Sequence, residues 1–251
     1  MISPSATRLD LTSKGFSVFH RVVGHDGTQS AAIAKYLADN DAKKVFIVDD
    51  GSAYGAGLTA ELVKKLGDIP FEQDKVQEQQ TQFDATVAKA VAAAPDFVFY
   101  GGYPREAAPL FRQLVQAGVT AQLLGADGLY DPALAENTEG AAEGAIITCP
   151  CLPADEAAGT FAADFEAEYG AAAGSYGAEG FDAMNVFIDV ITGGASTREA
   201  VLAGVNAYDA DGASKHIKFD SKGDVDPSVV VIWSYKVEGD GLVPVAPLSV
   251  Q

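Results

Sequence analysis

Basic side chains are scarce in this sequence. Its 251 residues contain 17 Lys and Arg against 35 Asp and Glu, which gives a formal net charge of −18 at pH 7. Nucleic-acid binding depends on clustered Lys and Arg that neutralise phosphates, so nucleic acid is excluded as an expected partner. The acidity itself names no other partner, and most of it is expected to lie on a solvated surface.

Long apolar runs are also missing. Although 48% of the residues are hydrophobic, no stretch approaches the roughly 20 consecutive apolar residues that cross a bilayer. The first residues show neither the basic region nor the apolar core of a signal peptide. Taken alone, this start predicts a cytoplasmic chain, and it equally fits an N-terminus that is not the natural one. The length suits one large domain or two modest ones.

Cysteine and histidine are too few for the usual metal sites. The two thiols, Cys149 and Cys151, would need His or carboxylate partners, and only three His are present. A disulfide between positions i and i+2 of a strand would be strained. We therefore expect two small apolar residues at the end of a strand, and neither a metal nor another cofactor.

Catalytic motifs are absent as well. The sequence has no G-x-G-x-x-G after a strand, no P-loop, no H-E-x-x-H and no G-x-S-x-G. His20, His25 and His216 do not fall together in a recognisable site, and each is expected to be structural. No enzyme is expected, because no nucleophile–base pair is visible. An enzyme of doubly wound fold is kept only as a remote alternative.

The first half of the chain alternates apolar strands with amphipathic helices. Strands are predicted at 44–50, 96–100, 121–124 and 144–148. The helices between them are marked by apolar stripes at 58–66, 83–91 and 110–115. This order predicts a parallel sheet with helices on both faces. Ligands of such sheets bind at the carboxyl ends of the strands.

The pattern changes after residue 153. Two helices are predicted around 161–169 and 183–190, and a third begins with the capping box Ser196…Glu199. Strands at 216–219 and 228–237 follow, with a turn at 221–224 between them and a second hairpin turn at 238–241.

Four loops at predicted strand ends carry the candidate binding residues: 3–7, 49–55, 100–104 and 125–128. Their glycines let the backbone approach a ligand, and their tyrosines offer a rigid apolar wall with a polar tip. Each loop alone is a weak signal, because a tyrosine at a helix start more often packs and an aspartate between glycines is often a turn residue. Their succession along alternating strands favours a ligand-binding site.

Five segments, in this order and at these spacings, resemble the leucine/isoleucine/valine-binding proteins, the type I solute-binding receptors of branched-chain amino-acid ABC transporters. They are MISPSATRLDL, VDDGSAYGAGL, FVFYGGYPREAAPLFRQL, LLGADGLYDPAL and GSYGAEGFDAMNVF. The resemblance covers essentially the whole chain. It implies an α/β, periplasmic binding protein type I-like fold of two lobes, each with a parallel sheet flanked by helices, and a ligand clamped between the lobes. It also implies a location outside the cytoplasm, either periplasmic or tethered outside the membrane.

The resemblance places six residues at ligand-contacting positions of the family: Ala6, Thr7, Tyr54, Tyr103, Asp127 and Tyr176. The first two would contact the α-groups of the amino acid, and the tyrosines would line its pocket. The aspartate would pair with the α-ammonium. These residue types suit a zwitterion, which needs an anion for its ammonium, donors for its carboxylate and an apolar wall for its side chain.

Two departures from the family pattern affect these expectations. The family usually has Glu where this chain has Asp127, and one methylene moves the carboxylate by about 1.5 Å, the length of one bond. The solute is then expected to sit deeper, or to be another amino acid or an amide. The family also has several strand–helix units of the first lobe, with a serine-rich loop, that have no counterpart in this sequence.

We therefore assign residues 1–22 and 151–225 to an incomplete first lobe, and residues 23–150 and 226–251 to the second lobe. An incomplete lobe would expose core surface, so a homodimer or a complementing N-terminal fragment is expected to cover it. The predicted function is capture of a free aliphatic, branched-chain amino acid for delivery to an ABC permease. The alternative is a truncated remnant that acts as a ligand-free interaction or dimerisation module.

Overall fold

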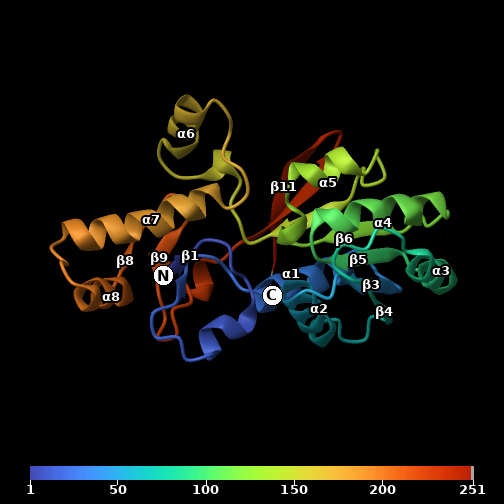
Figure 1. The fold of residues 1–251 in the computed structure, drawn as a ribbon, viewed down its shortest axis with the longest axis horizontal. Coiled ribbons are helices and arrows are strands. Elements are labelled where there is room, and N and C mark those ends of the chain that lie inside the picture. The colour runs from blue at the N-terminus through green and yellow to red at the C-terminus, as the bar shows by residue number, and fades with distance from the viewer. Residues whose placement is uncertain (250–251) are drawn as a thin grey trace. The chain divides into compact units, whose positions relative to one another are not determined.

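The computed structural model describes residues 1–249, and the chain divides into two compact units (Figure 1). Unit 1 consists of Met1–His25 and Pro150–Val231. Unit 2 consists of Asp26–Cys149 and Ile232–Gln251. The sequence analysis drew its boundaries after residues 22, 150 and 225. Each unit is described by itself below.

Unit 2 is built on a seven-stranded sheet in the order β11-β10-β7-β6-β5-β3-β4. The five strands from β7 to β4 are parallel, and β10 and β11 join antiparallel at one edge. The strands are β3 (Val45–Asp49), β4 (Phe71–Lys75), β5 (Phe97–Gly101), β6 (Gln122–Gly125), β7 (Ile146–Cys149), β10 (Ile232–Glu238) and β11 (Gly241–Leu248). The predicted parallel sheet is confirmed; β4 escaped prediction because its side chains are mostly polar and exposed.

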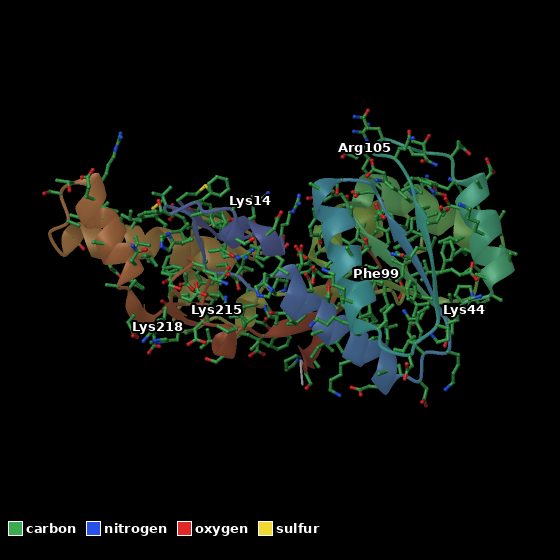
Figure 2. The ribbon with its side chains drawn as sticks, turned by 90° about the horizontal axis from the view of Figure 1, so that it is seen from below. Lys14, Lys44, Phe99, Arg105, Lys215 and Lys218 are labelled. Carbon is green, nitrogen blue, oxygen red and sulfur yellow. The ribbon has the colours of Figure 1, made fainter. Side chains whose placement is uncertain are left out.

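Helices cover both faces of this sheet, as predicted. They are α1 (Asp26–Asp39), α2 (Ala53–Lys65), α3 (Asp84–Ala93), α4 (Pro104–Gln116) and the short α5 (Pro132–Asn137). Side chains alternate across a strand, so Val45 and Ile47 of β3 pack with α1 and α2, whereas Phe46 and Val48 pack with α3 and α4. Phe99 of β5 packs in the same core as Val45 and Ile47, on the face covered by α1 and α2, and is fully buried (Figure 2).

Unit 1 has little sheet. Its strands form two pairs: β1 (Ile2–Ser3) with β2 (His20–Arg21) in parallel, and β8 (Asp209–Asp211) with β9 (His216–Lys218) in antiparallel. Its helices are α6 (Phe161–Tyr169), α7 (Gly177–Thr192) and α8 (Arg198–Asn206), all predicted. Short 3-10 turns add η1 (Leu9–Ser13), η3 (Ala154–Glu156) and η4 (Pro227–Val229). Among residues 1–249, no helix has the length and apolar character that crossing a membrane requires.

The first predicted hairpin is wrong. Strand β9 pairs with β8, and the following strand, β10, pairs with β7 and β11. The turn after β9 does form, since the Gly223 N–H donates to the Asp220 carbonyl. The chain then passes through η4 and enters the sheet of unit 2, so the two strands never meet. The turn predicted at 221–224 is therefore present, but the predicted pairing of its flanking strands is not, because tertiary contacts decide which strands pair.

Two local expectations also need correction. The N-cap of α8 is Thr197 and not Ser196: its side chain accepts a hydrogen bond from the Ala200 N–H at 3.1 Å. Cys149 and Cys151 are both disulfide-bonded and buried, so the expectation of two unpaired thiols is wrong. Strand β7 ends at Cys149 and the chain bends at Pro150, so the geometry of two residues on one extended strand does not apply.

Candidate functional site

The predicted loops of unit 2 meet at the carboxyl ends of its parallel strands. Tyr54 follows β3, Tyr103 follows β5 and Asp127 follows β6. The chain runs from β3 to β4 on one side and then continues with β5 on the other side of β3. The sheet order therefore reverses between β3 and β5, which is where open α/β sheets bind their ligands.

Tyr54 is placed by the start of α2. The Ser52 side chain caps that helix by accepting a hydrogen bond from the Gly55 N–H at 2.9 Å, and Tyr54 lies in the first turn. Its hydroxyl donates to Asp127 Oδ1 at 2.9 Å and accepts from the Gly128 N–H at 3.0 Å. One side chain thus ties the loop after β3 to the loop after β6.

Glycines make this contact sterically feasible. A Cβ at Gly128 would lie 2.6 Å from Tyr54 Cε1 and 2.6 Å from the carbonyl oxygen of Gly102. Both distances are shorter than real Cβ contacts, so only glycine lets these three loops approach so closely. The sequence predicted that these glycines let the backbone approach a ligand, which stays a prediction; in the structure, Gly128 lets the loops approach one another.

Tyr103 lies beside Tyr54 at the start of α4. The two ring centroids are 5.3 Å apart with an interplanar angle of 39°, within the range of favourable aromatic pairs. Tyr103 is the N-cap residue, and Pro104 occupies the first helical position, where its missing N–H costs no hydrogen bond. The Tyr103 side chain remains 47% exposed, so the ring offers apolar surface to a ligand.

The two tyrosines are neutral hydrogen-bonding groups at physiological pH. Burial raises the pKa of Tyr54 well above its usual value, and the nearby carboxylates of Asp127 and Asp26 raise it further. Burial also raises the pKa of Tyr103, with smaller contributions from Asp127, Asp50 and Asp26.

In unit 1, Ala6 and Thr7 lie on the loop that follows β1. The Ser3 hydroxyl accepts hydrogen bonds from the N–H groups of Ser5 (3.3 Å) and Ala6 (3.0 Å). The Thr7 side chain is buried. These bonds shape a tight loop immediately after the strand.

A buried arginine, Arg21, donates hydrogen bonds to the same loop. The sequence analysis did not predict this residue. The Arg21 guanidinium is fully buried and donates to the carbonyl oxygens of Ala6 (3.0 Å) and Arg8 (2.8 Å). It also forms an ion pair with Asp224 at 2.5 Å, and Thr12 donates to the same carboxylate at 2.8 Å. The partners are some 200 residues apart in sequence, so no local pattern could have indicated them.

Tyr176 also belongs to unit 1. It precedes α7 as the N-cap residue in a left-handed conformation, with φ of 60°. This conformation is uncommon for residues other than glycine and orients the chain at the start of the helix. The six predicted residues thus form two sets, with Tyr54, Tyr103 and Asp127 in contact in unit 2, and Ala6, Thr7 and Tyr176 in unit 1.

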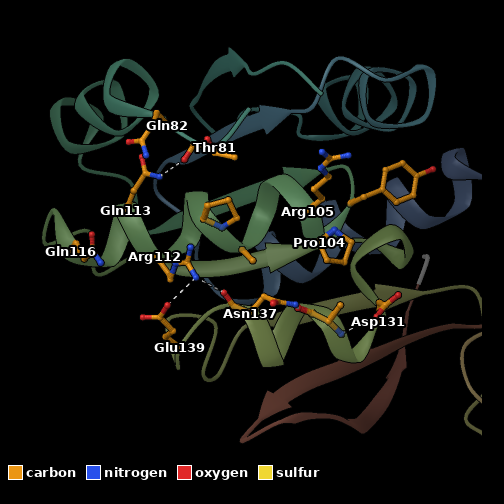
Figure 3. Close-up of a pocket in the computed structure, with 14 residues that line it drawn as sticks. Thr81, Gln82, Pro104, Arg105, Arg112, Gln113, Gln116, Asp131, Asn137 and Glu139 are labelled. Atoms are coloured by element: carbon orange, nitrogen blue, oxygen red, sulfur yellow. Dashed lines mark hydrogen bonds and ion pairs between the residues drawn. The ribbon is translucent and has the colours of Figure 1, made fainter. Parts of the chain in front are cut away.

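Unit 2 also has a surface hollow along α4, which shares Tyr103 with the candidate site (Figure 3). It runs from Tyr103 and Arg105 past Arg112, which donates to the Asn137 carbonyl at 2.8 Å and forms an ion pair with Glu139 at 3.1 Å. Polar amides, Arg105, the Arg112–Glu139 pair and apolar residues that include Pro104 and Pro109 line it. Among residues 1–249, no group of three or more His, Cys, Asp or Glu is placed to hold a metal ion.

The known proteins that resemble this chain are solute-binding proteins. The chain is 27% identical over 231 residues to the leucine-, isoleucine-, valine-, threonine-, and alanine-binding protein of Pseudomonas aeruginosa, which covers 90% of this chain and 62% of that protein. It is 28% identical over 250 residues to the leucine-specific-binding protein of Salmonella typhimurium, covering 97% and 68%. The chain thus spans less than two thirds of the first relative and slightly more of the second.

Solved structures show the same fold. The leucine binding protein LivK from Thermotoga maritima superposes with a TM-score of 0.91 at 27% identity, over 99% of this chain and 73% of that one. The protein LivJ from Streptococcus pneumoniae, in complex with isoleucine, matches with a TM-score of 0.85 at 21% identity, over 97% and 72%. The type I periplasmic-binding fold expected from the sequence is confirmed.

A sequence profile described as "Periplasmic binding protein" matches residues 1–228. This match extends over most of the 251 residues and agrees with the relatives and the fold. The chain therefore belongs to the periplasmic binding protein family.

Proposed function

We propose that this chain is an extracytoplasmic solute-binding receptor that binds a free aliphatic, branched-chain amino acid for delivery to an ABC permease. One observation carries the proposal: Tyr54 is hydrogen-bonded to Asp127 at the carboxyl edge of the unit 2 sheet, with Tyr103 beside it. The relatives named for binding leucine, isoleucine, valine, threonine or alanine support the ligand class.

The chemistry of this edge suits an amino acid. Asp127 is 9% exposed and supplies a carboxylate for an α-ammonium. The Tyr54 hydroxyl is bound to one of its oxygens and so orients it. The half-exposed Tyr103 ring supplies apolar surface for an aliphatic side chain. In unit 1, the loop with Ala6 and Thr7 is the proposed contact for the α-groups, and Tyr176 is a proposed pocket residue.

The proposed role is binding without chemical turnover. The family is one of solute-binding proteins, and the three histidines lie in unit 1 rather than at the edge that carries Tyr54 and Asp127. Neither a nucleophile nor a general base is therefore assigned. Delivery to an ABC permease, and a periplasmic or membrane-tethered location, form part of the same proposal.

A direct binding measurement tests the proposal. Isothermal titration of the purified chain with each of the twenty amino acids is expected to show binding of leucine, isoleucine or valine. Asp127→Asn should weaken that binding by about 1.5–3 kcal/mol, the usual contribution of a charged hydrogen bond. Asp131→Asn is the matched control, because Asp131 caps α5 through the Ala133 N–H in the same region. If Asp127→Asn binds the ligand as tightly as the unaltered chain, Asp127 is not the partner of the ammonium group.

A second candidate function is favoured by one face of α7. Phe181, Met184, Ile188 and Ile191 recur at helical spacing, and they are 49%, 60%, 47% and 53% exposed. Such an apolar stripe suits a homodimer or a complementing N-terminal fragment, and so a ligand-free interaction module. Light scattering after size exclusion discriminates the two functions: a stable dimer without any amino-acid binding favours the module, and a ligand-binding monomer favours the receptor.

A further inference from the structure

The sheet edge that carries the candidate site contains a buried carboxylate with no assigned role, Asp50. The residue is 1% exposed and directly follows β3. Its Oδ1 atom accepts a hydrogen bond from the Ser52 N–H at 2.9 Å. Its Oδ2 atom is buried and has no hydrogen-bond partner within residues 1–249. A buried carboxylate oxygen without a partner is costly, so its retention calls for a physical reason.

The position of Asp50 connects it to both tyrosines. A Cβ at Gly102, the residue before Tyr103, would lie 2.6 Å from Asp50 Oδ2. A Cβ at Gly55, the residue after Tyr54, would collide with Asp50 Oδ1. The carboxylate therefore lies against the backbone of both loops, one residue from each ring, yet these loops separate it from solvent.

Further carboxylates add their charge at the same edge. Asp26 is 1% exposed and Asp127 is 9% exposed. After burial itself, the charges of Asp127, Asp50 and Asp26 all contribute to the raised pKa of Tyr103, which places the three within electrostatic reach of one ring. Lys75 lies against Gly51 and acts on the neighbouring Asp49. Asp26, Asp50 and Asp127 thus all act electrostatically on the ring of Tyr103.

Such an arrangement favours a positively charged group at the rings. Charges interact more strongly where the protein excludes water and the effective dielectric constant is low. The faces of tyrosine rings also attract cations. We infer that this edge of unit 2 selects ligands by their positive charge, and that Asp50 is a specificity-determining residue that acts on the ligand's ammonium group without touching it. The inference rests on the proposed function, and it extends the ligand class to primary amines that lack a carboxylate.

The test is a titration of the purified chain with ligands that share the leucine side chain and differ in their charged groups. The series comprises leucine, the cation leucinamide, the cation 3-methylbutylamine and the anion 4-methylpentanoate. The two cations are expected to bind within about 100-fold of leucine, the range set by losing one charged hydrogen-bonding group. The anion is expected not to bind at millimolar concentration.

The results separate this inference from the proposed function. Binding of leucine without either cation would overturn the inference and leave the receptor function standing. Binding of the cations without leucine would overturn the proposed function and support the inference. Binding of the anion in the same range as leucine would also overturn the inference.

Asp50→Asn tests the residue itself. The amide keeps an acceptor for the Ser52 N–H and removes only the charge. The ratio of the leucinamide Kd to the leucine Kd should rise about tenfold, because the net cation loses more than the zwitterion at an effective dielectric constant of about 20. A purely structural role would weaken both ligands equally and leave the ratio unchanged, which would refute the assignment. Asp68→Asn, an exposed residue of the same unit, is the control for charge alone; if Asp50→Asn fails to fold, the ligand series on the unaltered chain still decides.

Discussion

The Tyr54 hydroxyl stands between two loops, donating to Asp127 Oδ1 at 2.9 Å and accepting from the Gly128 N–H at 3.0 Å. These bonds use both hydrogen-bonding capacities of one buried oxygen. The loop after β3 and the loop after β6 are 73 residues apart in sequence at this contact. The hydroxyl therefore sets the orientation of the carboxylate that we propose as the ammonium partner.

Removing this hydroxyl should lower both the free energy of unfolding and the affinity for the ligand. Tyr54→Phe leaves the Gly128 N–H without its acceptor and removes the hydroxyl donor to Asp127 Oδ1, and such a loss costs about 1–3 kcal/mol of unfolding free energy. Ligand affinity should fall about tenfold because Asp127 is no longer oriented. Urea unfolding and calorimetry measure the two effects. Tyr36→Phe, a partly buried tyrosine of α1, should leave affinity unchanged; similar losses in both variants would contradict the role of Tyr54.

Gly128 should not tolerate a side chain. Gly128→Ala places a Cβ 2.6 Å from both Tyr54 Cε1 and the Gly102 carbonyl oxygen, and overpacking of this kind typically costs about 1–3 kcal/mol. Displacement of the Tyr54 ring should also lower ligand affinity. The control is Gly180→Ala in α7, where a Cβ meets nothing within 4 Å and helix propensity favours alanine by up to about 1 kcal/mol. Thermal unfolding of both variants checks the opposite signs.

The buried ion pair of unit 1 should be sensitive to truncation. Arg21→Met removes the ion pair with Asp224 and leaves the carbonyl oxygens of Ala6 and Arg8 without the hydrogen bonds that Arg21 donates. Breaking a buried pair on one side costs about 3–5 kcal/mol, so we expect a large loss of stability by chemical denaturation. Arg8→Met breaks only a surface pair with Asp10 and should cost about 1 kcal/mol or less. A mild Arg21→Met variant would show that the Ala6–Thr7 loop is held by other contacts.

Two histidines should titrate on opposite sides of the ordinary value of 6.5. The hydrogen bonds that the protonated His216 ring donates to Asp211 and Asp209 raise its pKa, so its contribution to stability is complete below pH 6.5 and is lost as the pH rises through the folded-state pKa. Burial lowers the pKa of His20, so its contribution is complete above pH 6.5 and is lost as the pH falls from 6.5 through the lower folded-state pKa.

An NMR titration of the imidazole resonances measures both values in one experiment. Asp211→Asn should lower the midpoint of His216 and leave that of His20 in place. A His216 midpoint at or below 6.5 in the unaltered chain would show that its carboxylate contacts do not persist in solution.

Hydrophobic patterning predicted most of unit 2. The apolar run of β3 and the stripe of α2 are local signals, because burial on both faces of a strand and on one face of a helix is written in neighbouring residues. Strand β4 was missed because its exposed, polar residues carry no such signal. Helix α1 was missed as well, with a composition of small and polar residues that form no wide apolar stripe.

The candidate site was predicted in its residues but not in its contacts. Tyr54, Tyr103 and Asp127 stand out in the sequence through flanking glycines, and the resemblance supplied their proposed roles. The hydrogen bond between Tyr54 and Asp127 could not be predicted, since it depends on the packing of loops from three strands. The pairing of Arg21 with Asp224 was not predicted, because the two residues are 203 positions apart in sequence.

The sequence by itself determined the alternation of strands and helices, the glycines that allow close approach and the family resemblance, because each is carried by residues near one another in the chain. Only the tertiary structure decided the partner of β10, the disulfide of Cys149 and Cys151, the Arg21–Asp224 pair and the burial of Asp50 beneath both tyrosine loops. These features depend on which distant segments meet. Burial and electrostatic interactions depend on which distant segments pack together, whereas helix periodicity is present in neighbouring residues of the sequence.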